Sequence, residues 1–217
     1  MCIFALYFKV LSMNNETYIE DLKMIREIMN RSSRFISLSG LSGVFAGSFA
    51  LIGAYLAYLT VYSNQDYLQY SKAVLTTETI ATLLLIAVVV LLLSITMGIF
   101  LSKRKARKDK EKVWNLQAKR MLINLFIPLI TGGFLSLIFL FKGYIGIVAP
   151  LTLIFYGLAL VNASKYTLTE IRSLGIVEII LGLLAAQFIG YGLIFWALGF
   201  GVLHIIYGIA MHLKYRS

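Results

Sequence analysis

Six long apolar segments constrain the fold of this chain more than any other feature. Each is close to the ~20 helical residues that cross a ~30 Å hydrocarbon layer, and none shows the two-residue alternation of a barrel strand. Helices satisfy their own backbone hydrogen bonds in lipid, so we expect an all-α, polytopic bundle of six transmembrane helices. The predicted spans are 35–62, 80–101, 121–141, 144–163, 168–190 and 193–213.

The composition also indicates a membrane protein. Hydrophobic residues make up 59% of the chain and charged residues 14%, whereas soluble domains average ~45–50% and ~25%. Too little polar surface remains to cover a globule in water, so lipid has to cover the apolar faces. Because no linker rich in Pro, Gly or Ser divides the chain, we expect one transmembrane domain, 35–213, after an amino-terminal cytoplasmic segment, 1–34.

The amino-terminal segment contains a predicted amphipathic helix, 17–31. Thr17 and Glu20 have the spacing of a capping box, and apolar residues then recur at helical periodicity. We expect this helix to lie on the membrane or against the bundle, and a surface for a protein partner or for self-association is the alternative. The apolar stretch 1–11 lacks a basic n-region and a cleavage site, so we expect no cleaved signal peptide, and Met13 is a second candidate start of translation.

Positive charge is concentrated between the second and third predicted spans. Nine of the 20 Lys and Arg residues lie in the segment 102–120, which we predict to be a cytoplasmic loop. With both termini in the cytoplasm, 18 of the 20 lie on the cytoplasmic side, as the positive-inside rule requires. We expect them to set the topology and to attract anionic lipid; binding of nucleic acid is disfavoured because no recognition fold accompanies them. The nine are Lys103, Arg104, Lys105, Arg107, Lys108, Lys110, Lys112, Lys119 and Arg120.

Four polar residues near the cytoplasmic ends of the spans are candidates for an intramembrane site: Glu178, His204, Asn124 and Asn162. A charged residue in a span is costly and by default marks a site. If the small-residue faces of the last two spans meet, Glu178 and His204 would lie within reach of each other, either to exchange a proton or as a structural hydrogen bond. We expect the amide of each asparagine to satisfy a nearby backbone group, and the alternative is that the two asparagines line a shallow cytoplasmic cavity with Glu178 and His204.

Two prolines and a glycine stripe predict bent or closely packed helices. Pro128 and Pro150 each remove a backbone hydrogen bond, so we expect both of their helices to bend, either to form a site or for packing alone. Gly40, Gly43 and Gly47 lie along one face of the first span. There they would let another helix approach closely, within the bundle or in a dimer.

No sequence motif indicates an enzyme, a cofactor or a metal site. The zinc-helix, nucleophile-turn and phosphate-loop motifs are missing. His204 and His212 lie ~80° apart around a helix, which does not suit a shared metal. We predict a non-enzymatic module for interaction, sensing or assembly. The alternative is a small-solute or proton-coupled transporter with a polar cavity that faces the cytoplasm, and an intramembrane enzyme ranks third.

A resemblance adds a cellular location. Two stretches of the sequence are Leu-Val-Asn-Ala-Ser-Lys-Tyr-Thr-Leu, which begins at Leu160, and Phe-Trp-Ala-Leu-Gly-Phe-Gly-Val-Leu-His-Ile-Ile-Tyr-Gly, which ends at Gly208. Both resemble segments of bacterial six-span integral membrane proteins to which no activity is assigned. The capped helix and Ser-Arg-Phe-Ile-Ser-Leu-Ser-Gly, which ends at Gly40, are similar too. The resemblance implies a multi-pass protein of the bacterial cytoplasmic (inner) membrane, and it transfers no site residue.

Overall fold

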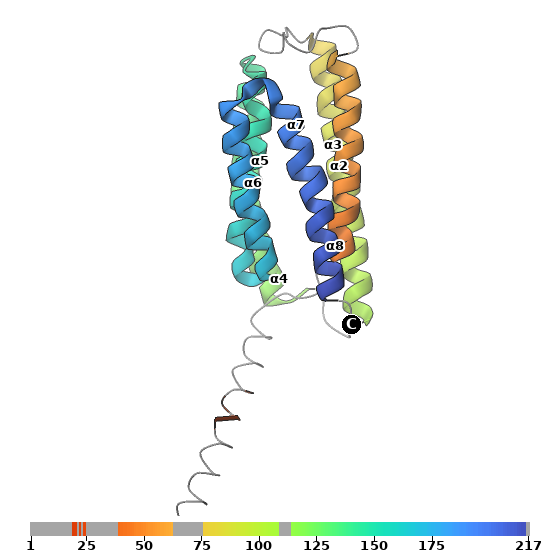
Figure 1. Ribbon diagram of the computed structural model, residues 1–217, viewed down its shortest axis with the longest axis vertical. Coiled ribbons are helices and arrows are strands. Elements are labelled where there is room, and N and C mark those ends of the chain that lie inside the picture. The colour runs from red at the N-terminus through yellow and green to blue at the C-terminus, as the bar shows by residue number, and fades with distance from the viewer. Residues whose placement is uncertain are drawn as a thin grey trace, which may run out of the picture.

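The computed structural model describes residues 19–20, 22, 24, 39–62, 76–108 and 114–215, and every regular element in those ranges is helical. The predicted all-α architecture is therefore confirmed. The long helices lie side by side in one elongated bundle (Figure 1). They are α2 (Gly40–Tyr62), α3 (Thr77–Lys108), α4 (Leu116–Phe141), α5 (Val148–Ala163) and α6 (Thr169–Gln187).

The last membrane-length helix is made of three consecutive segments. α7 (Gly192–Trp196) runs into η5 (Ala197–Leu203), which is a π-helix, and η5 runs into α8 (His204–Lys214). A π turn inserts an extra residue per turn and shifts the faces of the helix that follows it. Short 3-10 turns lie between α4 and α5, between α5 and α6, and between α6 and α7: η2 (Ile145–Ile147), η3 (Ser164–Tyr166) and η4 (Ile189–Tyr191).

Five stretches are long and apolar enough to cross a membrane, which marks the chain as a membrane protein by length and composition. The sixth predicted span, 168–190, corresponds to α6 but does not belong to this set. Its charged residues are the reason, because Glu170, Arg172 and Glu178 all lie within its 19 residues. The five stretches are Gly40–Val61, Thr77–Lys108, Leu116–Phe141, Ile145–Tyr166 and Ile189–Lys214.

The basic segment 102–120 contains more helix than the sequence analysis predicted. α3 continues to Lys108, and Ala106 in this extension is fully buried. α4 begins at Leu116, where the side chain of Asn115 accepts a hydrogen bond of 2.7 Å from the backbone N–H of Ala118. A run of Lys and Arg ends an apolar span, but it is compatible with the last turns of a helix, where cations interact favourably with the helix dipole.

Several predicted features lie partly or wholly outside the described residues. Of the predicted amphipathic helix 17–31, only Ile19, Glu20, Leu22 and Met24 are described, and these four are helical and exposed. Lys110 and Lys112 of the basic segment also lie outside the described ranges.

The helices form two groups that the last helix joins. In one group, α4 packs on α5 and α5 packs on α6; in the other, α2 packs on α3. α7 contacts α5 and α6, whereas η5 and α8 pack along α2, so the last helix crosses from the first group to the second (Figure 1).

The predicted glycine stripe of α2 packs inside the bundle, against η5 and α8. A Cβ atom on Gly43 would lie 3.1 Å from the carbonyl oxygen of His204 and 3.2 Å from the Cα of Gly208. Gly40 meets the backbone of α8 in the same way, and Gly47 meets the backbone of η5. Such contacts need glycine on α2 because a side chain there would separate the two backbones.

The glycines of α6 and α8 pack against other helices and not against each other, so the condition considered for a contact between Glu178 and His204 is not the one that holds. A Cβ atom on Gly175 of α6 would lie 2.7 Å from the carbonyl oxygen of Gly157, and one on Gly182 would lie 2.9 Å from the backbone nitrogen of Ile154, both on α5. Gly208 of α8 faces α2 instead. Each glycine face therefore pairs with a different helix.

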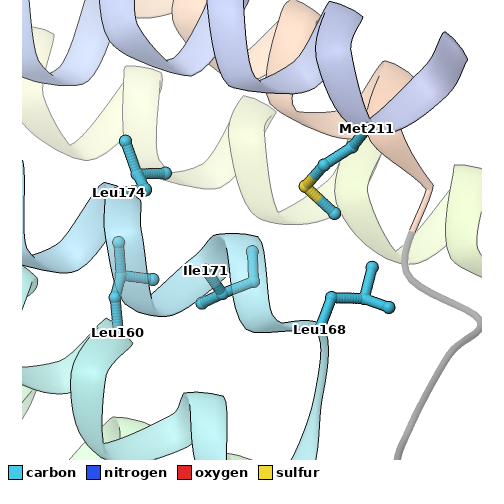
Figure 2. Close-up of a cluster of buried hydrophobic side chains, with 5 residues drawn as sticks. All are labelled: Leu160, Leu168, Ile171, Leu174 and Met211. Carbon is cyan, nitrogen blue, oxygen red and sulfur yellow. The ribbon is translucent and has the colours of Figure 1, made fainter. Parts of the chain in front are cut away.

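A cluster of buried apolar side chains joins the two groups at the end of the bundle where α3 and α8 terminate. Figure 2 shows Met211 of α8 reaching toward side chains of α5 and of the start of α6. The buried members are Leu160, Leu168, Ile171, Leu174 and Met211.

We predict that Gly208→Ala destabilises the bundle and that Gly133→Ala does not. The added methyl group at residue 208 would lie 2.6 Å from the backbone nitrogen of Val44, so α2 and α8 must separate, at a cost of about 1–3 kcal/mol. No atom lies within 4 Å of the same position on Gly133 in α4, where Ala should be neutral or stabilise the helix by up to ~1 kcal/mol. Thermal unfolding in detergent, followed by circular dichroism, measures the difference. Equal melting temperatures for the two variants would contradict the close contact.

Candidate functional site

The structure brings Glu178 and His204 together in the interior. The Oε1 atom of Glu178 lies 3.5 Å from the Nδ1 atom of His204. Glu178 has no exposed surface and His204 is 8% exposed. Glu178 belongs to α6 and His204 begins α8, so this contact bridges the two helix groups.

Both ring nitrogens of His204 have hydrogen-bond partners. Nδ1 lies 3.0 Å from the carbonyl oxygen of Gly199. Because a carbonyl only accepts, Nδ1 carries a proton in this arrangement. Nε2 lies 2.7 Å from the hydroxyl oxygen of Tyr156. In a neutral ring, Nε2 accepts, and the Tyr156 hydroxyl is then the donor.

The carboxyl group of Glu178 is in a different situation. Within the described part of the chain, neither of its oxygens has a hydrogen-bond partner. A buried carboxylate without hydrogen bonds is costly, so the group needs either a proton or a nearby cation. The imidazole of His204 is the adjacent group that can supply the positive charge.

Gly199 provides the space that the Glu178 carboxyl group occupies. A Cβ atom at residue 199 would collide with the Oε2 atom of Glu178 and would lie 2.6 Å from the side chain of Leu153. The carbonyl oxygen of the same glycine accepts from His204. Gly199 lies within η5, and π turns occur often at functional sites. The sequence analysis missed this segment; its signal is the run Gly-Phe-Gly that ends three residues before His204.

Aromatic rings continue from His204 toward the other end of the bundle. The ring of Phe200 stacks on that of His204 with an interplanar angle of 18° and a centroid distance of 6.0 Å. The ring centroid of Phe200 lies 4.9 Å from that of Trp196 and 4.8 Å from that of Tyr156. Trp196 in turn lines a cavity of about 740 Å³ between the two groups.

The two predicted asparagines form a separate structural contact. The side-chain amide of Asn162 donates a 3.0 Å hydrogen bond to the backbone carbonyl of Asn124, which is the carbonyl that Pro128 leaves without its helical partner. The side chain of Asn124 donates to the carbonyl of Arg120. Both asparagines therefore satisfy backbone groups, as the favoured interpretation held, and they do not line a shared cavity with Glu178 and His204.

Pro150 also has a different position from the one predicted. It lies in the first turn of α5, directly after η2. Backbone N–H groups of a first turn have no partner within the helix, so proline costs no hydrogen bond there. The lost hydrogen bond on which the predicted bend at Pro150 rested is therefore not a cost at this position. α4 continues through Pro128 from Leu116 to Phe141.

A second polar cluster joins the two groups at the basic end of the bundle. Lys214 of α8 donates to the carboxylate of Glu170 in the first turn of α6, and the hydroxyl of Tyr215 lies 3.1 Å from both oxygens of that carboxylate. The ammonium group of Lys105 lies 5.9 Å from the centre of the Tyr215 ring. Partial burial raises the pKa of Tyr215, and the hydrogen bond with Glu170 raises it further.

No protein family, curated protein or solved structure matches the chain. The bacterial origin that the sequence resemblance implied stays a prediction. The arrangement of Glu178, His204 and Tyr156 is therefore the feature of the chain that points to a function.

We predict that the contact between Asn162 and the Asn124 carbonyl compensates for Pro128. Asn162→Leu removes the donor and should lower the free energy of unfolding by about 1–3 kcal/mol. In a Pro128→Ala background, the new backbone N–H can pair with the freed carbonyl, so Asn162→Leu should cost less. A double-mutant cycle of unfolding in detergent measures this coupling. Additive effects of the two substitutions would contradict it.

Proposed function

We propose that this protein is a proton-coupled transporter of a small solute, with six spans in the bacterial cytoplasmic membrane and both termini in the cytoplasm. The observation that carries the proposal is the contact between Glu178 and His204. A carboxyl group and an imidazole that lie together away from water, and that bridge two helix groups, form an arrangement suited to taking up and releasing a proton.

The charges of α6 are compatible with a sixth span. Glu170 and Arg172 lie in its first turns, at the end of the bundle where charged side chains reach water. Only Glu178 of its charged residues lies deeper, and it is shielded from lipid by its neighbours. α6 also runs alongside α5 over nearly the whole height of the bundle (Figure 1). These features support a span that composition alone does not identify.

A proton on Glu178 would change the hydrogen bonds of the π segment. The protonated carboxyl has an O–H donor that faces Nδ1 of His204, and Nδ1 accepts it only if the ring carries its proton on Nε2 instead. Nε2 then donates to Tyr156, and the bond from Nδ1 to the Gly199 carbonyl is lost. Protonation is thereby coupled to the segment that fixes α8 relative to α7. This step links proton binding to movement of the two groups.

The predicted interaction module has less support than transport. It rests on the amphipathic helix 17–31, which lies almost entirely outside the described residues, and on the basic segment 102–120, and it stays a prediction. The transport proposal itself changes in one respect. The cavity that Trp196 lines is apolar and lies away from the basic helix ends, in contrast to the predicted polar cavity that faces the cytoplasm.

We predict that Glu178→Gln abolishes a pH response of Trp196 fluorescence. The chain has two tryptophans, so Trp114→Phe leaves Trp196 as the reporter, and Phe200 connects its ring to His204. In lipid nanodiscs, the emission of Trp196 should change with pH. Glu178→Gln should make the emission independent of pH because the side-chain amide of glutamine does not titrate. Glu170→Gln is the matched control, since it removes an acid from the same helix outside the interior, and it should leave the titration intact.

The same variants test transport directly. In vesicles that contain a pH-sensitive dye, the Trp114→Phe protein should couple entry of a solute from a panel of small molecules to a change in internal pH. Glu178→Gln should remove that coupling and Glu170→Gln should retain it. A Glu178→Gln protein that transports with an unaltered proton coupling would refute the proposed role.

We also predict the orientation from the distribution of basic residues. In a Cys2→Ser background, a cysteine at Lys108 should react with a membrane-impermeant maleimide only after the membrane is opened, because the end of α3 lies in the cytoplasm. A cysteine at Lys142, between α4 and α5, should react in intact spheroplasts. Labelling of the Lys108 position in intact spheroplasts would show that the orientation is reversed.

A further inference from the structure

The cavity at the end of the bundle opposite the basic helix ends is a second potential site. It has a volume of about 740 Å³ and lies between α2, α3, the start of α5 and α7. This volume is within the ~300–1,000 Å³ of typical small-molecule sites. At this end α7 contacts α5 and α6 more extensively than α2, whereas η5 and α8 pack along α2 nearer the basic end.

Small side chains hollow out this cavity. Its walls include Gly53 and Ala57 of α2, Ala87 of α3, Ala149 of α5 and Gly192 of α7. Larger residues at Ala57 and Ala87 would extend into the space between the groups, whereas Gly53 lets α2 pack closely on Val90 of α3 beside it. The cavity thus depends on small residues that four separate helices contribute.

The chemistry of the lining selects an uncharged, apolar occupant. None of the lining residues carries a formal charge at neutral pH, and the side-chain polar groups are those of Tyr144, Thr152 and Trp196. The Thr152 hydroxyl already donates to the carbonyl of Ala149. An ion or a strongly polar solute would lose its hydration here without gaining partners.

The surroundings of the cavity supply hydrocarbon chains. On α3, Ile86 and Val90 line the cavity, while Leu85 and Val89 beside them are exposed on the outside of the bundle. The apolar surface is therefore continuous from the cavity to the face of α3 that lipid covers in a membrane. The phenol of Tyr144, which is 61% exposed, lies where the bundle ends and can contact a polar head group.

We infer that this cavity binds the hydrocarbon chain of a lipid, with the head group beside Tyr144 and the chain extending toward Trp196 in the space between the pair α2 and α3 and the helices α5 and α7. This inference does not depend on proton coupling, since a bound chain can be a substrate or a fixed part of the structure. It goes beyond ordinary lipid contact because it assigns one chain to a defined space between the helix groups.

A photoreactive fatty acid with a diazirine near the end of its chain tests the inference. The full-length protein in vesicles that contain this probe is irradiated, and mass spectrometry locates the labelled peptides. We expect labelling around Ala57, Ala87 and Trp196. Ala57→Phe combined with Ala87→Phe fills the cavity and should reduce that labelling by about tenfold or more, equivalent to a loss of ~1.4 kcal/mol of binding free energy.

Ala81→Phe is the matched control, because Ala81 is an exposed alanine of α3 outside the cavity lining. It should leave labelling of the cavity unchanged, and circular dichroism with size-exclusion chromatography verifies that each variant is folded. Labelling spread evenly over the lipid-facing helix surfaces and unaffected by Ala57→Phe with Ala87→Phe would overturn the inference. Displacement by a compact aromatic competitor, but not by excess unlabelled fatty acid, would also overturn it by identifying a different class of ligand.

Glu178→Gln separates this inference from the proposed function. Cavity labelling should persist in that variant, since Glu178 does not line the cavity. If the cavity is labelled but the Trp196 emission of the parent protein does not respond to pH, proton coupling is disproved and the lipid site is not. A normal pH response without cavity labelling would disprove the lipid site alone.

Discussion

Close contact between the backbones of α2 and α8 determines where the rest of the bundle lies. Lipid tails are as apolar as leucine side chains, so helices in a membrane associate mainly through tight packing and polar contacts. Gly43 and Gly208 permit that packing, with a separation that leaves no room for a side chain. The contact holds α8 against α2, whereas α7 stays beside α5 and α6. The last helix must therefore cross between the groups, and its π segment lies at the crossing.

The crossing explains why the two ends of the bundle differ. At the basic end, Met211 packs into the apolar cluster, and Lys214 with Tyr215 contacts Glu170. Solvent weakens an ion pair with an exposed lysine, so the buried apolar cluster is the more important contact there. At the other end, α2 and α3 diverge from α5, and the space between them is the apolar cavity. One helix that changes partners along its length thus produces a closed end and an open end.

Hydropathy alone predicted most of the helices, because each span must be long and apolar whatever its neighbours are. The end of α3 was misplaced because the first lysine ends the apolar span, while helical hydrogen bonding continues for several residues to Lys108. Sequence periodicity identified the glycine faces of α2, α6 and α8 but not their partners, which depend on the whole bundle. The π segment was missed for a related reason, since its extra residue is stabilised by the tertiary contacts of Gly199. The freed carbonyl of Asn124 was predictable from Pro128, but its donor, Asn162, comes from another helix.

The side chain of Asn162 makes a polar contact with a structural role, and the contacts of Glu178 differ from it. Asn162 donates to a carbonyl at 3.0 Å, and its own oxygen lies 3.3 Å from the ammonium group of Lys165, so both ends of the amide are paired. Glu178 is more deeply buried, yet neither of its oxygens has a hydrogen-bond partner among the described residues. Its neighbour, Nδ1 of His204, is already engaged with the Gly199 carbonyl. A residue selected only to hold α6 against α8 would be satisfied in this position, as Asn162 is. An acid that lacks a hydrogen bond until it gains a proton is suited to a role in which that proton comes and goes.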